Sequence, residues 1–251
     1  MNGKIGVFDS GLGGLSVLKE LRKLLPNENY LFYEDSLHVP YGEKSDEELL
    51  KLCCDIVDYL IAHDCKIIVI ACNTATTSCM KRLRELYPNM IFVGTVPAIK
   101  VAYDHNYKNT IILSTPYTTK SKRVQELIRD YHREDQNLYL VSGENLAGLV
   151  EENNTEEIIK VLQRVLLPYM GKVDSIVLGC THYSLIKKEI LSILNDVVLL
   201  DGCVGISHEV KRQLESNHLL NSSNHMGKLT IINTKNDKLI ERSYELLEKE
   251  F

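Results

Sequence analysis

The sequence predicts an α/β protein of two similar lobes, each a mostly parallel sheet flanked by helices, with the active site in the cleft between them. Short apolar runs alternate along the chain with longer stretches of helical periodicity, which is typical of parallel sheets. A polar motif that follows one apolar run at Cys72 recurs after another at Cys180. The 251 residues suffice for two domains of about 100–150 residues each.

The expected elements alternate in order along the chain. Strands are predicted at residues 4–8, 29–33, 67–71, 91–93, 110–114, 138–141, 175–178 and 197–200. Helices are predicted at residues 15–25, 45–63, 76–87, 120–131, 155–170 and 184–194. Leu15, Leu18, Leu21 and Leu25 share one face of the first helix, and Ser45 begins a capping box that opens the second.

A break between the lobes is expected near Gly94 and Pro97. The first lobe is predicted to comprise residues 1–95 plus 207–251, because the periodic segments after Ser207 return to it. The second lobe is predicted to comprise residues 96–206. Ligands of parallel α/β sheets bind at the carboxyl ends of the strands, and every polar cluster described next follows a predicted strand.

Composition excludes several classes of partner. The formal charge is −5 and basic residues are scattered, so neither nucleic acid nor an anionic membrane is an expected partner. No apolar segment approaches the ~20 residues that cross a bilayer, and the N-terminus does not resemble a signal peptide. Seven cysteines without disulfide-like spacing indicate free thiols in a reducing cytoplasm. No C-x-x-C or H-x-x-x-H pair occurs, so no metal site is predicted.

A glycine-rich turn follows the first predicted strand. Its Gly11-Leu-Gly-Gly14 segment lacks the third glycine of a dinucleotide loop, because Ser16 occupies that position. A tight turn explains these glycines equally well. Asp9 and Ser10 precede the turn, and a carboxylate with a hydroxyl at a strand end suits an ammonium or hydroxyl group of a substrate.

Cys72 and Cys180 differ from the other cysteines because hydrogen-bonding residues follow each at a predicted helix start. Cys53, Cys54, Cys65 and Cys79 are interpreted instead as small buried hydrophobes. A helix N-terminus stabilises a thiolate, and His182 beside Cys180 could act as a general acid. Two facing thiols suit removing a proton from one side of a carbon and returning one to the other. A thiol nucleophile and a redox pair are the competing interpretations.

Four motifs, in order, closely resemble those of the glutamate racemase family, which belongs to the cofactor-independent aspartate/glutamate racemase superfamily. The motifs are Phe8-Asp-Ser-Gly-Leu-Gly-Gly-Leu15, Tyr33-Glu-Asp-Ser-Leu-His-Val-Pro-Tyr-Gly-Glu-Lys-Ser45, Ala71-Cys-Asn-Thr-Ala-Thr76 and Leu178-Gly-Cys-Thr-His-Tyr183. The resemblance is collinear across roughly residues 4 to 205. The first two motifs point to glutamate racemases, whereas the cysteine motifs mark the wider superfamily.

The resemblance implies racemisation of glutamate without pyridoxal phosphate or metal, supplying D-glutamate for peptidoglycan in a bacterial cytoplasm. It implies that Cys72 is the base for D-glutamate and Cys180 the base for L-glutamate, with Asp9 and His182 as further catalytic residues. It also implies a set of substrate-binding residues: Asp9, Ser10, Pro40, Tyr41, Gly42, Asn73, Thr74, Thr115, Thr118, Glu151, Thr181 and His182. The sequence does not define the oligomeric state, and a homodimer is one candidate.

The chain also departs from the family pattern, at Ser142-Gly143, Gly148, Ser184 and Gly202-Cys203, none of which is a predicted catalytic position. These departures concern the substrate pocket and regulation rather than the reaction. Two alternative functions stay open beside glutamate racemisation: an aspartate or other amino-acid racemase of the superfamily, and a non-catalytic amino-acid-binding relative.

Overall fold

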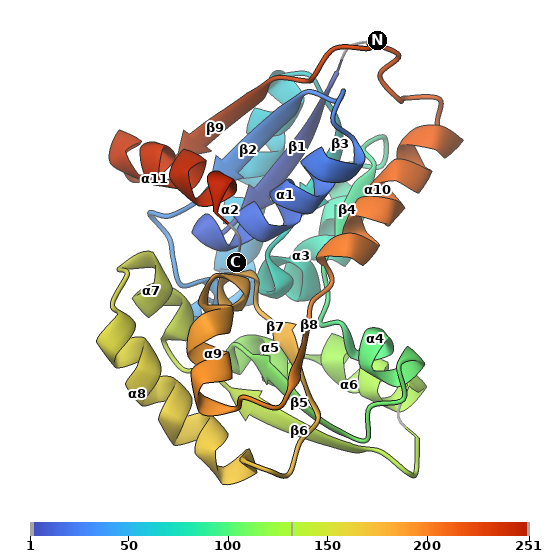
Figure 1. The fold of residues 1–251 in the computed structure, drawn as a ribbon. Helices are drawn as coiled ribbons and strands as arrows, with labels where there is room; N and C mark the ends of the chain where they lie inside the picture. The colour runs from blue at the N-terminus through green and yellow to red at the C-terminus, as the bar shows by residue number, and fades with distance from the viewer. Residues whose placement is uncertain (1–2, 132, 250–251) are drawn as a thin grey trace. The chain divides into compact units, whose positions relative to one another are not determined.

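The structure is a computed structural model that describes residues 3–131 and 133–249. The chain divides into two compact units (Figure 1). Within the described residues, unit 1 lies in Met1–Thr95 and Cys203–Glu250, and unit 2 in Val96–Gly202. No helix of the described residues is long and apolar enough to cross a membrane.

Unit 1 is built on a five-stranded sheet in the order β4-β3-β1-β2-β9, with every pairing parallel. Its strands are β1 (Lys4–Asp9), β2 (Tyr30–Glu34), β3 (Cys65–Ile70), β4 (Phe92–Gly94) and β9 (Leu229–Asn233). The central strand β1 pairs with β2 on one side and β3 on the other, with Val7 opposite Phe32 and Val69. Because all five strands run in the same direction, their carboxyl ends share one edge of the sheet.

Helices cover this sheet. They are η1 (Leu12–Gly14), α1 (Leu15–Leu24), η2 (Tyr41–Glu43), α2 (Asp46–Ala62), α3 (Asn73–Leu86), α10 (Cys203–Ser216) and α11 (Asp237–Glu248). Helices α2 and α3 pack together, as do α1 and α10 (Figure 1). Apolar side chains of α2 and α3 form a buried cluster with Phe8, Ile68 and Ile70 of the sheet. The predicted capping box is present: Glu48 N–H donates to Ser45 Oγ, and Ser45 N–H donates to Glu48 Oε2.

Unit 2 has a four-stranded, wholly parallel sheet in the order β6-β5-β7-β8. Its strands are β5 (Asn109–Ser114), β6 (Asn137–Ser142), β7 (Ser175–Gly179) and β8 (Val198–Leu200). Its helices are α4 (Ile99–Asp104), α5 (Pro116–Lys120), α6 (Lys122–Tyr131), α7 (Leu146–Glu151), α8 (Thr155–Leu166), η3 (Leu167–Tyr169), η4 (Thr181–Ile186) and α9 (Lys187–Ile193). Because successive side chains of a strand point to opposite faces, alternate residues of β5 and β7 face the two sides of this sheet.

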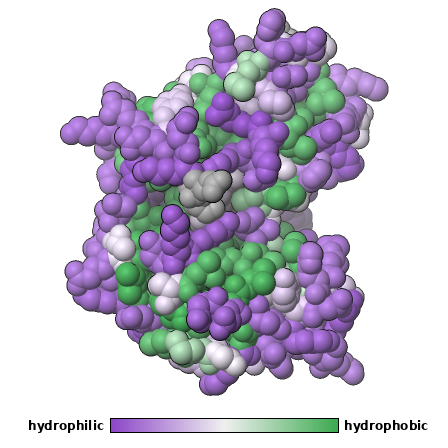
Figure 2. Space-filling view, in the orientation of Figure 1, coloured by the Kyte–Doolittle hydropathy of each residue, from purple (hydrophilic) through white to green (hydrophobic). Residues whose placement is uncertain are grey.

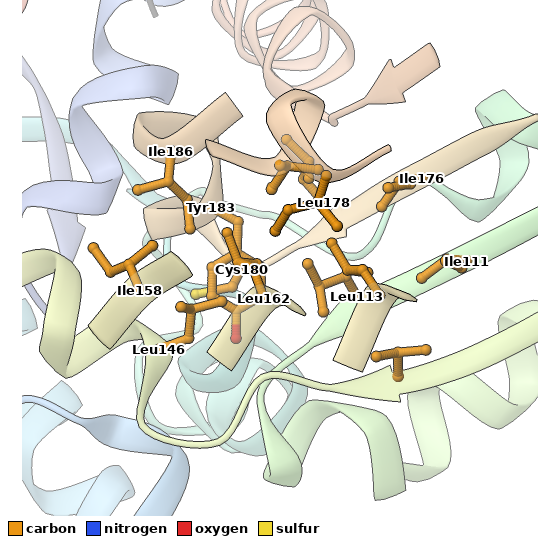
Figure 3. Close-up of a cluster of buried hydrophobic side chains, with 14 of the residues drawn as sticks. Ile111, Leu113, Leu146, Ile158, Leu162, Ile176, Leu178, Cys180, Tyr183 and Ile186 are labelled. Carbon is orange, nitrogen blue, oxygen red and sulfur yellow. The ribbon is translucent and has the colours of Figure 1, made fainter. Parts of the chain in front are cut away.

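Both faces of the unit 2 sheet are covered. Ile111 and Ile176 lie in a buried cluster with residues of α7, α8 and α9, part of which Figure 3 shows. Ile112 and Val177 point the other way, into a smaller cluster with residues of α4 and α6. Hydrophilic side chains cover most of the face of the molecule seen in Figure 2, as expected when the apolar runs are used inside each unit.

The predicted fold class of mostly parallel α/β sheets flanked by helices is confirmed. Several predicted helices have different bounds. The helix predicted at 76–87 begins earlier, at Asn73, because Cys72 is its N-cap. The helix predicted at 155–170 ends at Leu166, where Pro168 enters a 3-10 turn. The helix predicted at 184–194 is a 3-10 segment up to Ile186 and becomes α-helical only afterwards.

Candidate active site

Asp9 and Ser10 lie at the carboxyl end of β1, the central strand of unit 1, and both are buried. Asp9 Oδ1 accepts a hydrogen bond from Gly11 N–H at 3.0 Å, and Ser10 Oγ lies 3.5 Å from the same oxygen. A Cβ atom at Gly14 would come within 2.6 Å of the Asp9 Cβ. The glycine-rich turn therefore lets the chain pack closely over a fixed carboxylate.

Cys72 follows β3, the strand beside β1, and caps the fourteen-residue helix α3. Its side chain is buried, and Cys72 Sγ accepts from Ala75 N–H at 3.5 Å. The thiol also lies 3.7 Å from Ser10 Oγ, to which it can donate. Backbone N–H groups and the dipole at a helix N-terminus stabilise a thiolate, so this position suits a thiol that exchanges a proton.

Asn73 and Thr74 form the first turn of α3, directly after the thiol, and both are buried. Asn73 Oδ1 has no hydrogen-bond partner among the described residues. Buried amide oxygens are normally satisfied, so this atom is available to a donor such as a substrate amino group or a water molecule. The position agrees with a substrate-binding role for Asn73.

The loop after β2 holds Pro40, Tyr41 and Gly42, with Pro40 just before the 3-10 turn η2 and the other two inside it. Tyr41 is buried, and its hydroxyl donates to Asp35 Oδ2 at 2.6 Å. Burial and the nearby Asp35 carboxylate raise the pKa of Tyr41, so its hydroxyl stays protonated. The buried Asp35 also accepts from Thr234 Oγ1 at 3.0 Å.

Sequence reasoning missed Asp35 and Thr234. Asp35 directly follows β2 within a recognised motif, so a carboxylate at a strand end could have indicated its role. Thr234 follows β9 and is about 200 positions away along the chain, and only the pairing of β9 with β2 brings it to Asp35.

Cys180 follows β7 in unit 2 and lies against buried residues that include Leu146, Leu178 and Tyr183 (Figure 3). A helix begins directly after this thiol, as expected, but it is a 3-10 helix rather than an α-helix. The residues that follow form the 3-10 segment η4, and the Cys180 side chain makes no capping hydrogen bond within it. Its near neighbour is His182, whose Nδ1 lies 3.9 Å from Cys180 Sγ.

His182 links Cys180 to Glu151, and we refer to these three side chains as the Cys180 relay. His182 Nε2 lies 2.7 Å from Glu151 Oε1, and the two side chains are 1% and 10% exposed. Burial lowers the pKa of His182, but its contacts with the Cys180 and Glu151 side chains outweigh burial, so the pKa lies well above its ordinary value. The imidazolium can therefore stabilise a thiolate at Cys180 while Glu151 stabilises the imidazolium.

Threonines surround the corresponding strand ends of unit 2. Thr115 follows β5 and caps α5, accepting from Thr118 N–H at 3.2 Å. Its hydroxyl also donates to Thr118 Oγ1 at 3.1 Å. Thr115, Thr118 and Thr181 are all buried. Hydroxyl groups at these positions can bind carboxylate or amino groups of a substrate.

The two units place their predicted residues in equivalent ways. In unit 1, Asp9 is the last residue of β1 and Cys72 follows the neighbouring β3. In unit 2, Thr115 follows β5 and Cys180 follows the neighbouring β7. The predicted site residues outside α7 therefore lie at the carboxyl end of a strand or in the segment that follows it, and Glu151 reaches His182 from the end of α7.

All seven cysteines lie in the described part of the chain and are free. Cys53, Cys65 and Cys79 are buried and Cys54 is half-buried. A hydrogen bond to Cys79, together with burial, raises the pKa of Cys53, so this thiol stays protonated in the core. Within residues 3–131 and 133–249, no group of three or more His, Cys, Asp or Glu side chains is placed to hold a metal ion.

Comparisons with known proteins agree with this chemistry. The family described as Asp/Glu/Hydantoin racemase matches residues 6–205. The chain is 41% identical to a glutamate racemase of Clostridium kluyveri over 252 residues, covering 98% of this chain and 97% of that protein. It is 39% identical to a glutamate racemase of Clostridium botulinum over 253 residues, covering 98% of each.

Solved structures of glutamate racemases have the same fold. The Francisella tularensis enzyme in complex with D-glutamate matches with a TM-score of 0.83 at 27% identity, over 100% of this chain and 95% of that one. The Escherichia coli enzyme in complex with L-glutamate and the activator UDP-MurNAc-ala matches with a TM-score of 0.84 at 30% identity, over 98% and 96%.

Proposed function

We propose that this chain, which belongs to the Asp/Glu/hydantoin racemase family, interconverts L- and D-glutamate with Cys72 and Cys180 as its two acid–base groups. The chain is an amino-acid racemase, and glutamate racemases about 40% identical over almost its whole length support glutamate as the substrate. One observation carries the mechanism: each unit places a thiol after an inner strand of its sheet, with polar partners next to it.

The reaction needs one proton removed and one returned. The thiolate of one cysteine takes the α-proton and becomes a thiol, and the carbon retains the electron pair of the broken C–H bond. The thiol of the other cysteine then donates its proton to the opposite face of that carbon and becomes a thiolate. Because the α-hydrogen is a weak acid, hydrogen-bond donors must stabilise the negative charge that develops on the substrate.

The proposed roles follow the two groups of residues. Cys72, beside Asp9 and Ser10, is the base for D-glutamate, and Cys180, supported by His182, is the base for L-glutamate. The remaining proposed substrate-binding residues are Pro40, Tyr41, Gly42, Asn73, Thr74, Thr115, Thr118, Glu151 and Thr181. The unpartnered Asn73 Oδ1 and the buried threonine hydroxyls support this assignment. The mechanism requires neither cofactor nor metal.

The proposed setting is the bacterial cytoplasm, where D-glutamate is consumed in peptidoglycan synthesis. A modest formal charge of −5 with scattered basic residues supports an enzyme that binds neither nucleic acid nor an anionic membrane. A homodimer stays a prediction that sedimentation of the purified chain would test.

Deuterium incorporation at Cα tests the proposal. In D₂O, the wild-type enzyme should exchange the α-proton of both glutamate enantiomers, and Cys72→Ala and Cys180→Ala should each lose racemisation. Cys54→Ala, a half-buried thiol on α2, is the matched control and should stay active. Racemisation at the wild-type rate in either test variant would contradict the two-thiol mechanism.

A panel of amino acids in the same assay separates the alternatives. Exchange with aspartate but not with glutamate would identify an aspartate racemase. Tight binding of an amino acid without any exchange would identify a non-catalytic relative.

A further inference from the structure

Tyr183 lies directly after His182 and is fully buried in the cluster that contains Cys180 (Figure 3). Its hydroxyl donates to the backbone oxygen of Gly143 at 3.1 Å. A buried tyrosine hydroxyl needs such a partner, and this bond directs the ring from η4 toward the segment that precedes α7. Burial, and next the proximity of Cys180, raise the pKa of Tyr183, so the hydroxyl remains a donor.

The backbone of Gly143 is held in place by two hydrogen bonds, and its lack of a side chain leaves room for the Tyr183 hydroxyl. Its N–H donates to Ser114 O at 2.9 Å, which extends the β5–β6 pairing one step beyond β6. Its oxygen also accepts from Leu146 N–H at 3.3 Å, at the first residue of α7. A Cβ atom at position 143 would come within 2.5 Å of the Tyr183 hydroxyl oxygen and 3.0 Å of Cζ. Only a residue without a side chain fits here unless the tyrosine moves.

The segment from Gly143 to the end of α7 is therefore attached to η4 at two points. Tyr183 binds it just before α7 begins, and His182 binds it at Glu151, the last residue of α7. Because α7 has only six residues, the position of the first attachment, at Gly143, determines where the Glu151 carboxylate of the second attachment lies. The two attachments come from adjacent residues of η4, so they move together.

We propose, on the basis of the proposed function, that Tyr183 is a positioning residue: its bond to Gly143 sets the place of Glu151 against His182 and so controls proton transfer at Cys180. Tyr183 needs no contact with the substrate for this role. Proton transfer at Cys72 lies in the other unit and is not affected by it.

A kinetic signature distinguishes this role from a purely structural one. The two enantiomers have equal free energies, so kcat/KM must fall equally in both directions whatever the mutation does. The primary isotope effects of the two directions need not change together. If transfer at Cys180 becomes slow, the isotope effect on α-deuterated L-glutamate rises, because Cys180 breaks that bond. The isotope effect on α-deuterated D-glutamate falls, because its bond is broken by Cys72 before the slow step.

Tyr183→Phe removes only the hydroxyl and is the principal test. Misplacing a catalytic group by up to 1 Å can cost about 100-fold, so we expect kcat to fall about tenfold with a small change in KM. The isotope effect should rise for L-glutamate and fall for D-glutamate. Tyr139→Phe is the matched control, because Tyr139 packs against the same cluster from β6, and it should leave both isotope effects unchanged.

Gly143→Ala approaches the same bond from its other side and should produce the same opposed changes. In the double variant, loss of the Tyr183 hydroxyl relieves part of the clash with the methyl group that Gly143→Ala adds. Its fold-loss of kcat should therefore be smaller than the product of the fold-losses in the two single variants. This second route keeps the test decisive even if Tyr183→Phe folds poorly, because isotope effects do not depend on the amount of folded enzyme.

Wild-type isotope effects in both single variants, even with lower thermal stability, would overturn the positioning role. Failure of the proposed function has a different outcome, in which the wild-type enzyme itself does not exchange the α-proton of glutamate.

Discussion

Glu151→Gln is the change that most directly tests the Cys180 relay. The substitution keeps the shape of the side chain and one acceptor oxygen but removes the negative charge. His182 Nε2 lies 2.7 Å from Glu151 Oε1 in a site that is almost fully buried, so solvent cannot replace that charge. We therefore expect the pKa of His182 to fall, because the hydrogen bond to Cys180 still raises it but the Glu151 charge no longer does.

The size of the effect follows from the type of hydrogen bond. A bond to a charged group contributes about 1.5–3 kcal/mol, and a neutral one about 0.5–1.5 kcal/mol. The substitution should therefore cost about 1–1.5 kcal/mol, which is about tenfold in the balance between imidazolium and neutral imidazole. With less imidazolium, the thiolate at Cys180 loses its partner, and we expect kcat to fall about tenfold as well.

Two measurements check this prediction. NMR titration of the histidine ring signals should show the pKa of His182 lowered in Glu151→Gln. Steady-state kinetics over a pH series should show the activity declining at lower pH than in the wild type. Glu152→Gln, an exposed neighbour just after α7, is the matched control and should change neither quantity. A His182 titration that is the same in wild type and Glu151→Gln would refute the reasoning, because it would mean that the carboxylate does not hold the proton.

Three further outcomes are expected. Asp35→Asn weakens the acceptor of the Tyr41 and Thr234 hydroxyls, and leaving one donor unpaired costs about 1–3 kcal/mol. Because Tyr41 belongs to the proposed substrate-binding loop, the KM for glutamate should rise about tenfold. The exposed control Asp55→Asn should leave that KM unchanged. His182 has a raised pKa in the folded state, so its stabilisation is complete below pH 6.5 and is lost as the pH rises through the folded-state pKa. The gap in melting temperature between wild type and His182→Gln should accordingly narrow toward alkaline pH, and a constant gap would contradict the assignment. Leu162→Ala empties a fully buried position in unit 2 and should lower the free energy of unfolding in urea by about 2–5 kcal/mol, whereas Leu167→Ala, about half exposed, should cost far less.

Hydrophobic periodicity predicted most of the fold, because the inner strands β1, β3, β5 and β7 each contain a run of buried apolar residues. It did not predict how the two cysteine segments differ. Cys72 caps a long helix that begins at Asn73, three residues before the apolar pattern becomes helical, because capping depends on polar groups that carry no periodicity. Cys180 precedes a 3-10 segment with no capping bond, although its motif resembles the one at Cys72.

The candidate site shows the same division. Residues within a recognisable motif, such as Asn73 and Thr181, could be named from the sequence. Thr234 and the bond between Tyr183 and Gly143 could not, because each depends on contacts between segments far apart in the chain. Spatial proximity of this kind is a property of strand order, and the order β4-β3-β1-β2-β9 is not visible in any local pattern.

The pairing of β9 with β2 has a consequence for synthesis of the chain. A ribosome completes unit 2 and most of unit 1 before it adds Leu229–Asn233, which forms the last edge of the first sheet, and Thr234, which binds Asp35. Until then Asp35 lacks one of the donors around the loop that carries Tyr41. The contact between Thr234 and Asp35 can therefore form only after about nine-tenths of the chain has been translated.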